Sequence, residues 1–231
     1  GDPVSNTAGS ITSTVKASQA NGFSIVSYTG DANASKTIGH GLSTAPDMII
    51  VKGRNVAQNW VVYHSANTGS PETQRLYLDG TNATDTVAWW NNTAPTSSVF
   101  SVSNFGGTGG AYNYIAYCFH DVTGKQKFGT YTGDGTSDGS LAITTGFRVG
   151  WLMIKRTDSA HDWSIIDASR SPFNPTTKEL LANTSDSEAT AQRVNFTDTG
   201  FELMNAGGRV NANGGTYIYA AFAGSYSDYI T

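Results

Sequence analysis

Two tryptophans followed by two asparagines, at residues 89–92, are the residue types in this sequence best suited to bind a sugar. Indole faces cover the apolar C–H side of a pyranose ring, while side-chain amides hydrogen-bond to adjacent hydroxyl groups. Tyrosine adds rigid contact area at low entropic cost. The residues that we predict for a glycan-binding surface are Trp89, Trp90, Asn91, Asn92, Tyr112 and Asn113, with Tyr63 and Tyr77 as additional candidates. The alternative is that each indole caps the core of the fold.

Sequence patterns of known catalytic sites are absent. None of the four glutamates is paired with another carboxylate at strand spacing, so a glycosidase pair is not evident. The Gly-x-Ser-x-Gly elbow of a serine nucleophile does not occur, and the four histidines lack the spacing of a zinc site. Cys118 lies in an alternating run, which predicts a small core residue rather than a nucleophile. We therefore predict no catalytic residue and no enzymatic activity.

Two aspartates in a glycine-rich segment are the weak candidates for a metal site. Asp134 and Asp138 lie in the stretch TGDGTSDGS, where carboxylates and carbonyl oxygens could bind Ca²⁺. The stretch lacks the ligand spacing of an EF-hand loop, and a glycine-rich turn is the favoured interpretation. Apart from this Ca²⁺ possibility, the sequence predicts no cofactor.

Charge and hydropathy exclude two classes of partner. The net charge is −4 and charged residues make up 14% of the 231 residues, so no basic surface for nucleic acid is expected. The longest apolar runs, such as residues 48–51, are far shorter than the roughly 20 residues of a transmembrane helix, so membrane insertion is not expected. The single cysteine rules out an intramolecular disulfide, and stability must come from packing.

Four separated blocks of the sequence recur at one offset of 103 residues. The matching blocks begin at Tyr28 and Tyr131, end at Lys52 and Lys155, contain Trp60 and Trp163, and end at Phe119 and Phe222. The shared offset predicts two copies of one unit, at residues 23–121 and 126–231, with the matching part of the second ending near residue 224. Residues 1–22 precede the repeat and are interpreted as a linker or as one added strand at residues 11–16. Trp60 and Trp163 recur in both copies, so we predict that they are core residues.

Runs of β-branched and aromatic residues, bounded by Gly, Asn, Asp and Ser, predict strands in each copy. In the first copy these runs cover residues 23–29, 36–40, 47–53, 59–65, 74–79, 99–103 and 113–119. Seven short strands are typical of a sandwich. The predicted fold is therefore all-β, with two tandem similar units of about seven strands each, packed as β-sandwich modules of a jelly-roll or lectin-like type. Only residues 177–191 have the composition of a short helix.

The repeated blocks resemble a family of repeats found in predicted tail and fibre proteins of marine bacteriophages. The segments that carry the resemblance are residues 45–52, 89–100, 131–139, 155–158 and 214–223. Val149 departs from it, because many relatives have proline there, as this chain has at Pro46. The resemblance implies a virion-associated β module, lectin-like or structural, that is part of a tail or fibre and extracellular when it acts. It also implies a homo-oligomer, a trimer by analogy with phage fibres, and it carries over no catalytic residue.

The sequence and the resemblance together predict a non-enzymatic module of a phage tail fibre or similar appendage. Its predicted partners are a host-surface glycan or receptor and other virion proteins. One alternative is an enzyme that degrades surface polysaccharide, with Asp162 and Asp167 near Trp163 as the acidic residues. A second alternative is a purely structural or capsid-decorating protein, which is favoured if residues 89 and 90 are buried.

Overall fold

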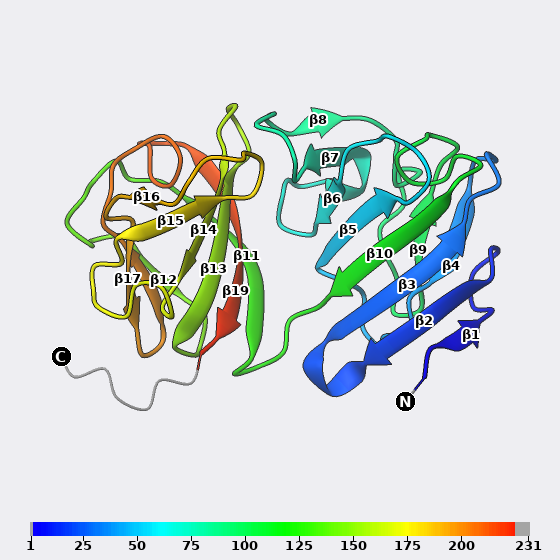
Figure 1. Ribbon diagram of the computed structural model, residues 1–231, viewed down its shortest axis with the longest axis horizontal. Coiled ribbons are helices and arrows are strands. Elements are labelled where there is room, and N and C mark those ends of the chain that lie inside the picture. The colour runs from blue at the N-terminus through cyan, green and yellow to red at the C-terminus, as the bar shows by residue number, and fades with distance from the viewer. Residues whose placement is uncertain (1, 225–231) are drawn as a thin grey trace. The chain divides into compact units, whose positions relative to one another are not determined.

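Antiparallel strands make up most of the regular structure in residues 2–224, the part of the chain that the computed structural model describes (Figure 1). Within these residues the only helices are two single turns of 3₁₀ helix, Gln19–Asn21 and Pro71–Thr73. The prediction of an all-β fold is confirmed. The chain divides into two compact units. Unit 1 runs to Gly80 and includes Thr84–Val122, whereas unit 2 consists of Thr81–Ala83 and the residues from Thr123 onward.

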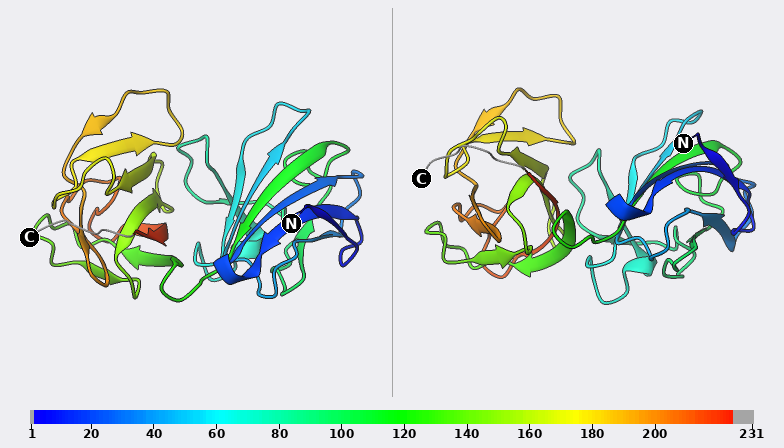
Figure 2. Two further views of the ribbon diagram at one scale, coloured as in Figure 1. Left: turned by 60° about the horizontal axis from the view of Figure 1, so that its bottom comes forward. Right: turned by 90° about the horizontal axis from the view of Figure 1, so that it is seen from below.

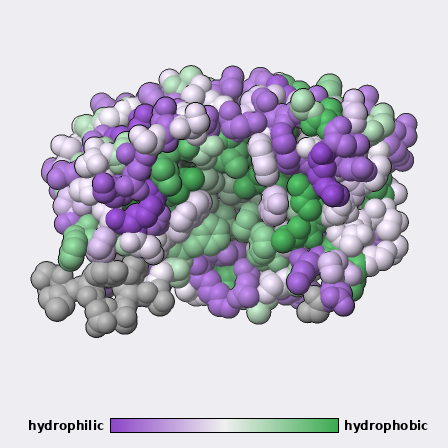
Figure 3. Space-filling view, in the orientation of Figure 1, coloured by the Kyte–Doolittle hydropathy of each residue, from purple (hydrophilic) through white to green (hydrophobic). Residues whose placement is uncertain are grey.

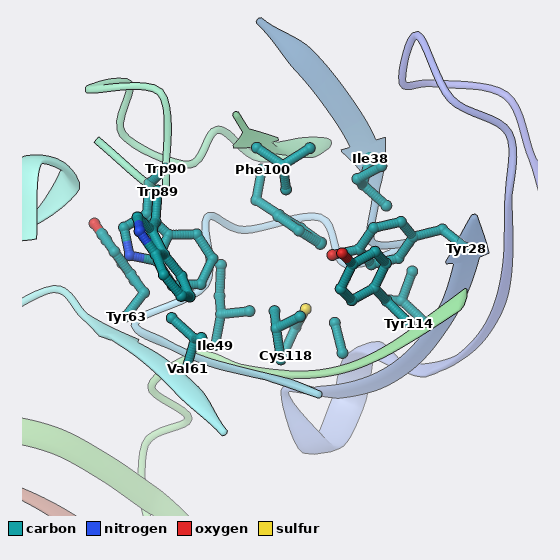
Figure 4. Packing of buried hydrophobic residues seen from close by; sticks show 14 of the residues in the cluster. Tyr28, Ile38, Ile49, Val61, Tyr63, Trp89, Trp90, Phe100, Tyr114 and Cys118 are labelled. Atoms are coloured by element: carbon teal, nitrogen blue, oxygen red, sulfur yellow. The ribbon is translucent and has the colours of Figure 1, made fainter. Parts of the chain in front are cut away.

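Unit 1 contains an eight-stranded antiparallel sheet and a two-stranded sheet. In spatial order, the large sheet consists of β1 (Val4–Asn6), β2 (Ser13–Ser18), β3 (Phe23–Thr29), β10 (Asn113–Phe119), β5 (Met48–Gly53), β6 (Val61–His64), β7 (Gln74–Tyr77) and β8 (Asp85–Thr86). The small sheet pairs β4 (Lys36–Gly39) with β9 (Val99–Val102). Each of the seven runs predicted in this part of the sequence contains one of these strands. Their inward residues form one hydrophobic cluster (Figure 4).

Strands β1 and β2, which precede the repeat, extend the large sheet of unit 1. Strand β2 pairs with β3 from Thr14 opposite Ser27 to Ser18 opposite Phe23, and β1 pairs with β2. Figure 2 shows the two dark blue strands continuing the sheet beyond β3. One added strand was expected at residues 11–16, and the structure places β2 at Ser13–Ser18 with β1 before it. Alternation in β2 buries Ser13 and Val15 and exposes Thr14 and Lys16, which gives this segment a face to bury.

Unit 2 contains a six-stranded and a three-stranded antiparallel sheet. The larger consists of β11 (Gln126–Thr132), β19 (Thr216–Ala223), β13 (Val149–Arg156), β14 (Trp163–Asp167), β15 (Lys178–Leu181) and β16 (Ala189–Thr190). The smaller consists of β12 (Ala142–Thr144), β18 (Gly200–Leu203) and β17 (Val194–Thr197). The short helix expected over residues 177–191 is wrong, because this segment forms the paired strands β15 and β16. Pairing with β14 outweighs the local propensity of the segment.

A stacked pair of tyrosines recurs in both units at the offset of 103 residues. Tyr28 on β3 stacks on Tyr114 on β10, with ring centroids 5.1 Å apart. Tyr131 on β11 stacks on Tyr217 on β19, with centroids 4.9 Å apart. In each pair the two tyrosines lie directly opposite each other in the strand register.

The buried tyrosine hydroxyls hold the loop that precedes the last strand of each unit. The hydroxyl of Tyr28 donates to the carbonyl of Thr108, and that of Tyr131 donates to the carbonyl of Val210, both at 2.6 Å. Burial raises the pKa of both tyrosines well above the usual value, so each phenol remains a neutral donor. A buried hydroxyl without a partner would cost stability, and these loops supply the acceptors.

The interiors of the two units differ in chemistry. In unit 2, the carboxylate of Glu179 on β15 is fully buried. It accepts hydrogen bonds from Ser164 Oγ at 2.6 Å, from Arg193 at 2.7 Å and from Arg209 at 2.9 Å. A buried carboxylate is stable when it is both paired and hydrogen-bonded, but removing one member leaves buried charges without compensation.

We expect Glu179→Ala to lower the free energy of unfolding by about 3–5 kcal/mol, because Arg193 and Arg209 lose their buried counter-charge. Urea denaturation followed by tryptophan fluorescence measures the loss. The matched control is Glu188→Ala, which removes an exposed partner of Arg170 and Lys178. Its effect should be about 1 kcal/mol or less. Equal effects of the two variants would contradict a stabilising role for the buried network.

Candidate functional site

Four loops of unit 1 meet at one end of its large sheet. We call this the loop end, and it consists of residues 30–36, 54–58, 89–93 and 103–113. The backbone N–H of Gly30 donates to the carbonyl of Tyr112 at 2.9 Å, and that of Ala32 donates to Gly109 at 3.0 Å. These bonds join the first loop to the last. The strand register brings the loops together, because Thr29 at the end of β3 lies opposite Asn113 at the start of β10.

The tryptophan doublet lies inside unit 1 rather than on its surface. Trp89 is 8% exposed and Trp90 is 1% exposed. Trp90 packs edge-on against Tyr63, which is also buried, with ring centroids 5.7 Å apart (Figure 4). The prediction that both indoles stack on a sugar is therefore wrong, and so is the placement of Tyr63 on the surface. The doublet fills the core, where an indole buries a large apolar area.

The two asparagines after the doublet form a left-handed turn. Their φ angles are 52° for Asn91 and 48° for Asn92, and Asn92 is exposed. Ala32 and Ser35 also have positive φ, at 60° and 61°. Within residues 2–224, these four are the only non-glycine residues with positive φ, and all lie at the loop end. Ser35 Oγ donates to Asn91 Oδ1 at 3.3 Å and joins the two loops. Strained backbone of this kind clusters at functional sites.

Two aromatic residues at the loop end are partly exposed. Phe105 is 42% exposed and stacks back on Trp89, with centroids 6.1 Å apart and an interplanar angle of 23°. Tyr112 is 37% exposed and lies against Gly110, where an added Cβ would be 3.2 Å from the ring. Three backbone N–H groups, from residues 108 to 110, donate to the carbonyl of Phe105 and keep the loop compact. The loop therefore presents both rings in fixed positions.

Sequence analysis identified Tyr112 and missed Phe105. Phe105 lies in the glycine-rich stretch SNFGGTGGAYN, outside any strand pattern. The sequence signal for Phe105 is its position among glycines, because glycines have no side chains to cover an aromatic ring. Tyr77 is half-buried and packs edge-on against Trp89, so it lines the inner side of the same cluster.

Amide groups lie beside the exposed rings. Asn55 Oδ1 accepts from the backbone N–H of Asn113 at 2.8 Å, and Asn113 Oδ1 accepts from Thr29 Oγ1 at 2.9 Å. Both asparagines are exposed, and neither Nδ2 has a partner among the described residues. The Gln58 amide and the Tyr112 ring both lie within 4 Å of the Cβ position of Gly106. The loop end thus combines rigid rings with outward-facing N–H donors.

The two aspartates predicted as weak candidates for Ca²⁺ binding accept hydrogen bonds from neighbouring residues. Asp134 Oδ1 accepts from the backbone and hydroxyl of Thr136, both at 2.9 Å, and from Asn211 at 2.8 Å. Asp138 Oδ1 accepts from the backbone N–H of Ser140, and hydrogen bonds from Ser140 lower the pKa of Asp138 to about 2. The geometry is that of a hydrogen-bonded turn, and Ca²⁺ binding there stays a prediction.

The two aspartates considered for polysaccharide hydrolysis also form ion pairs and hydrogen bonds within the protein. Asp162 accepts from Arg209 at 2.9 Å and from Asn183 at 2.8 Å. Asp167 pairs with Arg170 at 2.6 Å. In the part of the chain that the structure describes, no group of three or more His, Cys, Asp or Glu side chains is arranged to hold a metal ion.

The chain was compared with known proteins. The sequence model of one protein family, described as Domain of unknown function (DUF7483), matches residues 1–225. No curated protein and no solved structure matches the chain. None of the helices in residues 2–224 is long and apolar enough to span a membrane.

Trp90→Ala should lower the free energy of unfolding by about 3–5 kcal/mol, because it leaves a cavity in a packed core. Tyr112→Ala, a matched truncation at the exposed loop, should cost about 1 kcal/mol or less. Urea denaturation of both variants measures the difference. A Trp90→Ala protein with unchanged stability would contradict the burial of the doublet.

Cys118 should not react with a thiol reagent in the folded protein. Its side chain is fully buried on β10, and burial raises the pKa of the thiol to about 12. At pH 8, only about one thiol in 10⁴ is then ionised, and the thiolate is the reactive form. Labelling with a disulfide reagent at this pH should be complete in urea and negligible in buffer. Rapid labelling of the native protein would contradict this placement.

Proposed function

The chain belongs to the family described as Domain of unknown function (DUF7483), whose model matches residues 1–225, and we propose that it is a non-enzymatic glycan-binding module. The loop end of unit 1 is the proposed binding surface. The proposal also adopts the setting implied by the resemblance to phage repeats, a virion tail or fibre that meets a cell surface. Other virion proteins and further copies of the chain are partners under the same proposal.

The observation that carries the proposal is the pair of half-exposed rings, Phe105 and Tyr112. Phe105 stacks on Trp89, Tyr112 lies against Gly110, and both are partly open to solvent. A ring fixed in this way covers the C–H face of a pyranose without losing side-chain entropy on binding. The neighbouring amides of Asn55 and Asn113 supply donors to hydroxyl groups.

Two features of the loop support a binding role over a role in packing alone. Isolated exposed aromatics are ordinary on protein surfaces, but here two lie in one loop that is tied down by the buried hydroxyl of Tyr28. The four strained residues of the neighbouring loops lie at the same end. Preorganisation of this kind favours affinity because little order remains to be gained on binding.

A second candidate function is that of a purely structural virion component. The burial of Trp89 and Trp90 favours it, because the most aromatic segment of the sequence stabilises the core rather than a surface. This candidate requires no ligand, so the same experiment separates the two functions.

The purified chain should bind glycans on an array or on whole cells, and Tyr112→Ala and Phe105→Ala should each weaken that binding about tenfold or more. The matched control is Phe173→Ala, which removes a 69% exposed ring from unit 2 and should leave binding unchanged. Thermal melts establish that the variants fold.

Three outcomes would contradict the proposal. Binding that survives both ring truncations would place the ligand elsewhere. A wild-type chain that binds neither glycans nor cells would favour the structural role instead. Release of reducing ends from a bound polysaccharide would show the chain to be an enzyme.

A further inference from the structure

We propose that the loop end of unit 1 selects an acidic glycan, one whose pyranose rings carry carboxylate or sulfate groups. This inference rests on the proposed glycan-binding function and names the class of its ligand. Its basis is the combination of one uncompensated cation, a set of side-chain donors and two ring faces on the same loops.

Arg54 is the cation. It directly follows β5, it is exposed, and its backbone N–H donates to the carbonyl of Asn113 at 2.7 Å. No acidic side chain within the described residues pairs with its guanidinium group. This backbone bond joins Arg54 to Asn113, the residue that follows Tyr112 in the chain.

Four other charged residues at and around the loop end form two ion pairs. Lys36 pairs with Asp31 at 3.1 Å, and Arg75 pairs with Asp85 at 2.8 Å. Arg75 also lies over the Trp89 ring at 4.2 Å, on its inner side. Lys52 is half-buried, and its Nζ donates to the carbonyl of Gln58. Arg54 is therefore the exposed positive charge without an acidic partner on this surface, although the whole chain carries −4.

Two exposed asparagines at the loop end offer donors. Asn55 and Asn113 each use the side-chain oxygen internally, which leaves the Nδ2 group to point to a ligand. The guanidinium group of Arg54 has five N–H donors and no acceptor. Carboxylate and sulfate oxygens only accept hydrogen bonds, whereas a neutral hydroxyl both accepts and donates. A site that offers donors and a cation therefore suits an anionic group better than a neutral hydroxyl.

Unit 2 lacks this combination at the corresponding positions. At the offset of 103 residues, Arg54 corresponds to Thr157, while Phe105 and Tyr112 correspond to Gly208 and Gly215. Thr157 is buried and its hydroxyl bonds to Thr216. One acidic-glycan site per chain is therefore expected.

The test compares three purified polysaccharides: alginate, which carries carboxylates; carrageenan, which carries sulfates; and dextran, which is neutral. Isothermal titration of the full chain should show at least one acidic polymer binding about tenfold or more tightly than dextran. Higher ionic strength should weaken the binding of the acidic polymer and leave the binding of dextran unchanged, because added salt screens the charge of an exposed arginine. Comparing alginate with carrageenan identifies the anionic group.

Arg54→Gln keeps hydrogen-bonding capacity but removes the charge. It should weaken binding of the acidic polymer about tenfold and leave any dextran binding unchanged. The matched control is Lys16→Gln, which removes an exposed positive charge from β2 and should have no effect. Tyr112→Ala should weaken the binding of both acidic and neutral polymers, because it removes the ring that every pyranose would contact.

Three outcomes overturn the inference. If Tyr112-dependent binding is equal for acidic and neutral polymers, the acidic selectivity fails while the proposed glycan-binding function stands. If Arg54→Gln and Lys16→Gln weaken acidic binding equally, the attraction is general and not located at the loop end. If no polysaccharide or cell binds, the inference and the proposed function fail together.

Discussion

The requirement that buried tyrosine hydroxyls find acceptors determines much of the architecture. Tyr28 and Tyr114 stack inside unit 1, and their hydroxyls donate to the carbonyls of Thr108 and Gly106, both at 2.6 Å. Both acceptors lie in the loop that carries Phe105 and Tyr112. The cost of an unpaired buried phenol therefore fixes that surface loop against the core. Tyr131 and Tyr217 hold the corresponding loop of unit 2 in the same way.

On this shared framework, the two units stabilise their interiors by different interactions. Unit 1 stacks the guanidinium group of Arg75 on Trp89, with 4.2 Å between the group and the ring centroid. Unit 2 places Glu179 on the strand that corresponds to that of Arg75, and Arg193 binds its carboxylate. At these corresponding strands, unit 1 uses a cation–π contact and unit 2 uses an ion-pair network. In unit 1, Phe105 stacks on Trp89 and reaches the surface. In unit 2, Arg209 from the last loop forms a second ion pair with Glu179.

The sequence predicted strands well and surfaces poorly, for physical reasons. The run from Phe23 to Thr29 was predicted with its observed bounds, because alternation reports directly on a pleated, half-buried strand. Whether Trp90 points inward depends on where the turn at Asn91 and Asn92 directs the chain, and local pattern does not encode that direction. The helix expected over residues 177–191 failed because a buried Glu179 looks, in sequence, like any helix-favouring glutamate. Its partner Arg209 lies 30 residues away.

The two strands that precede the repeat also bear on how the chain behaves in solution. Strand β3 has seven residues, and β2 covers the side of it that β10 does not. Strand β1, which ends the sheet, has only three residues. A long uncovered strand offers its backbone N–H and C=O groups to other chains, whereas a very short terminal strand offers few. Strands β1 and β2 thus leave this side of the sheet with a three-residue edge strand in place of the seven residues of β3.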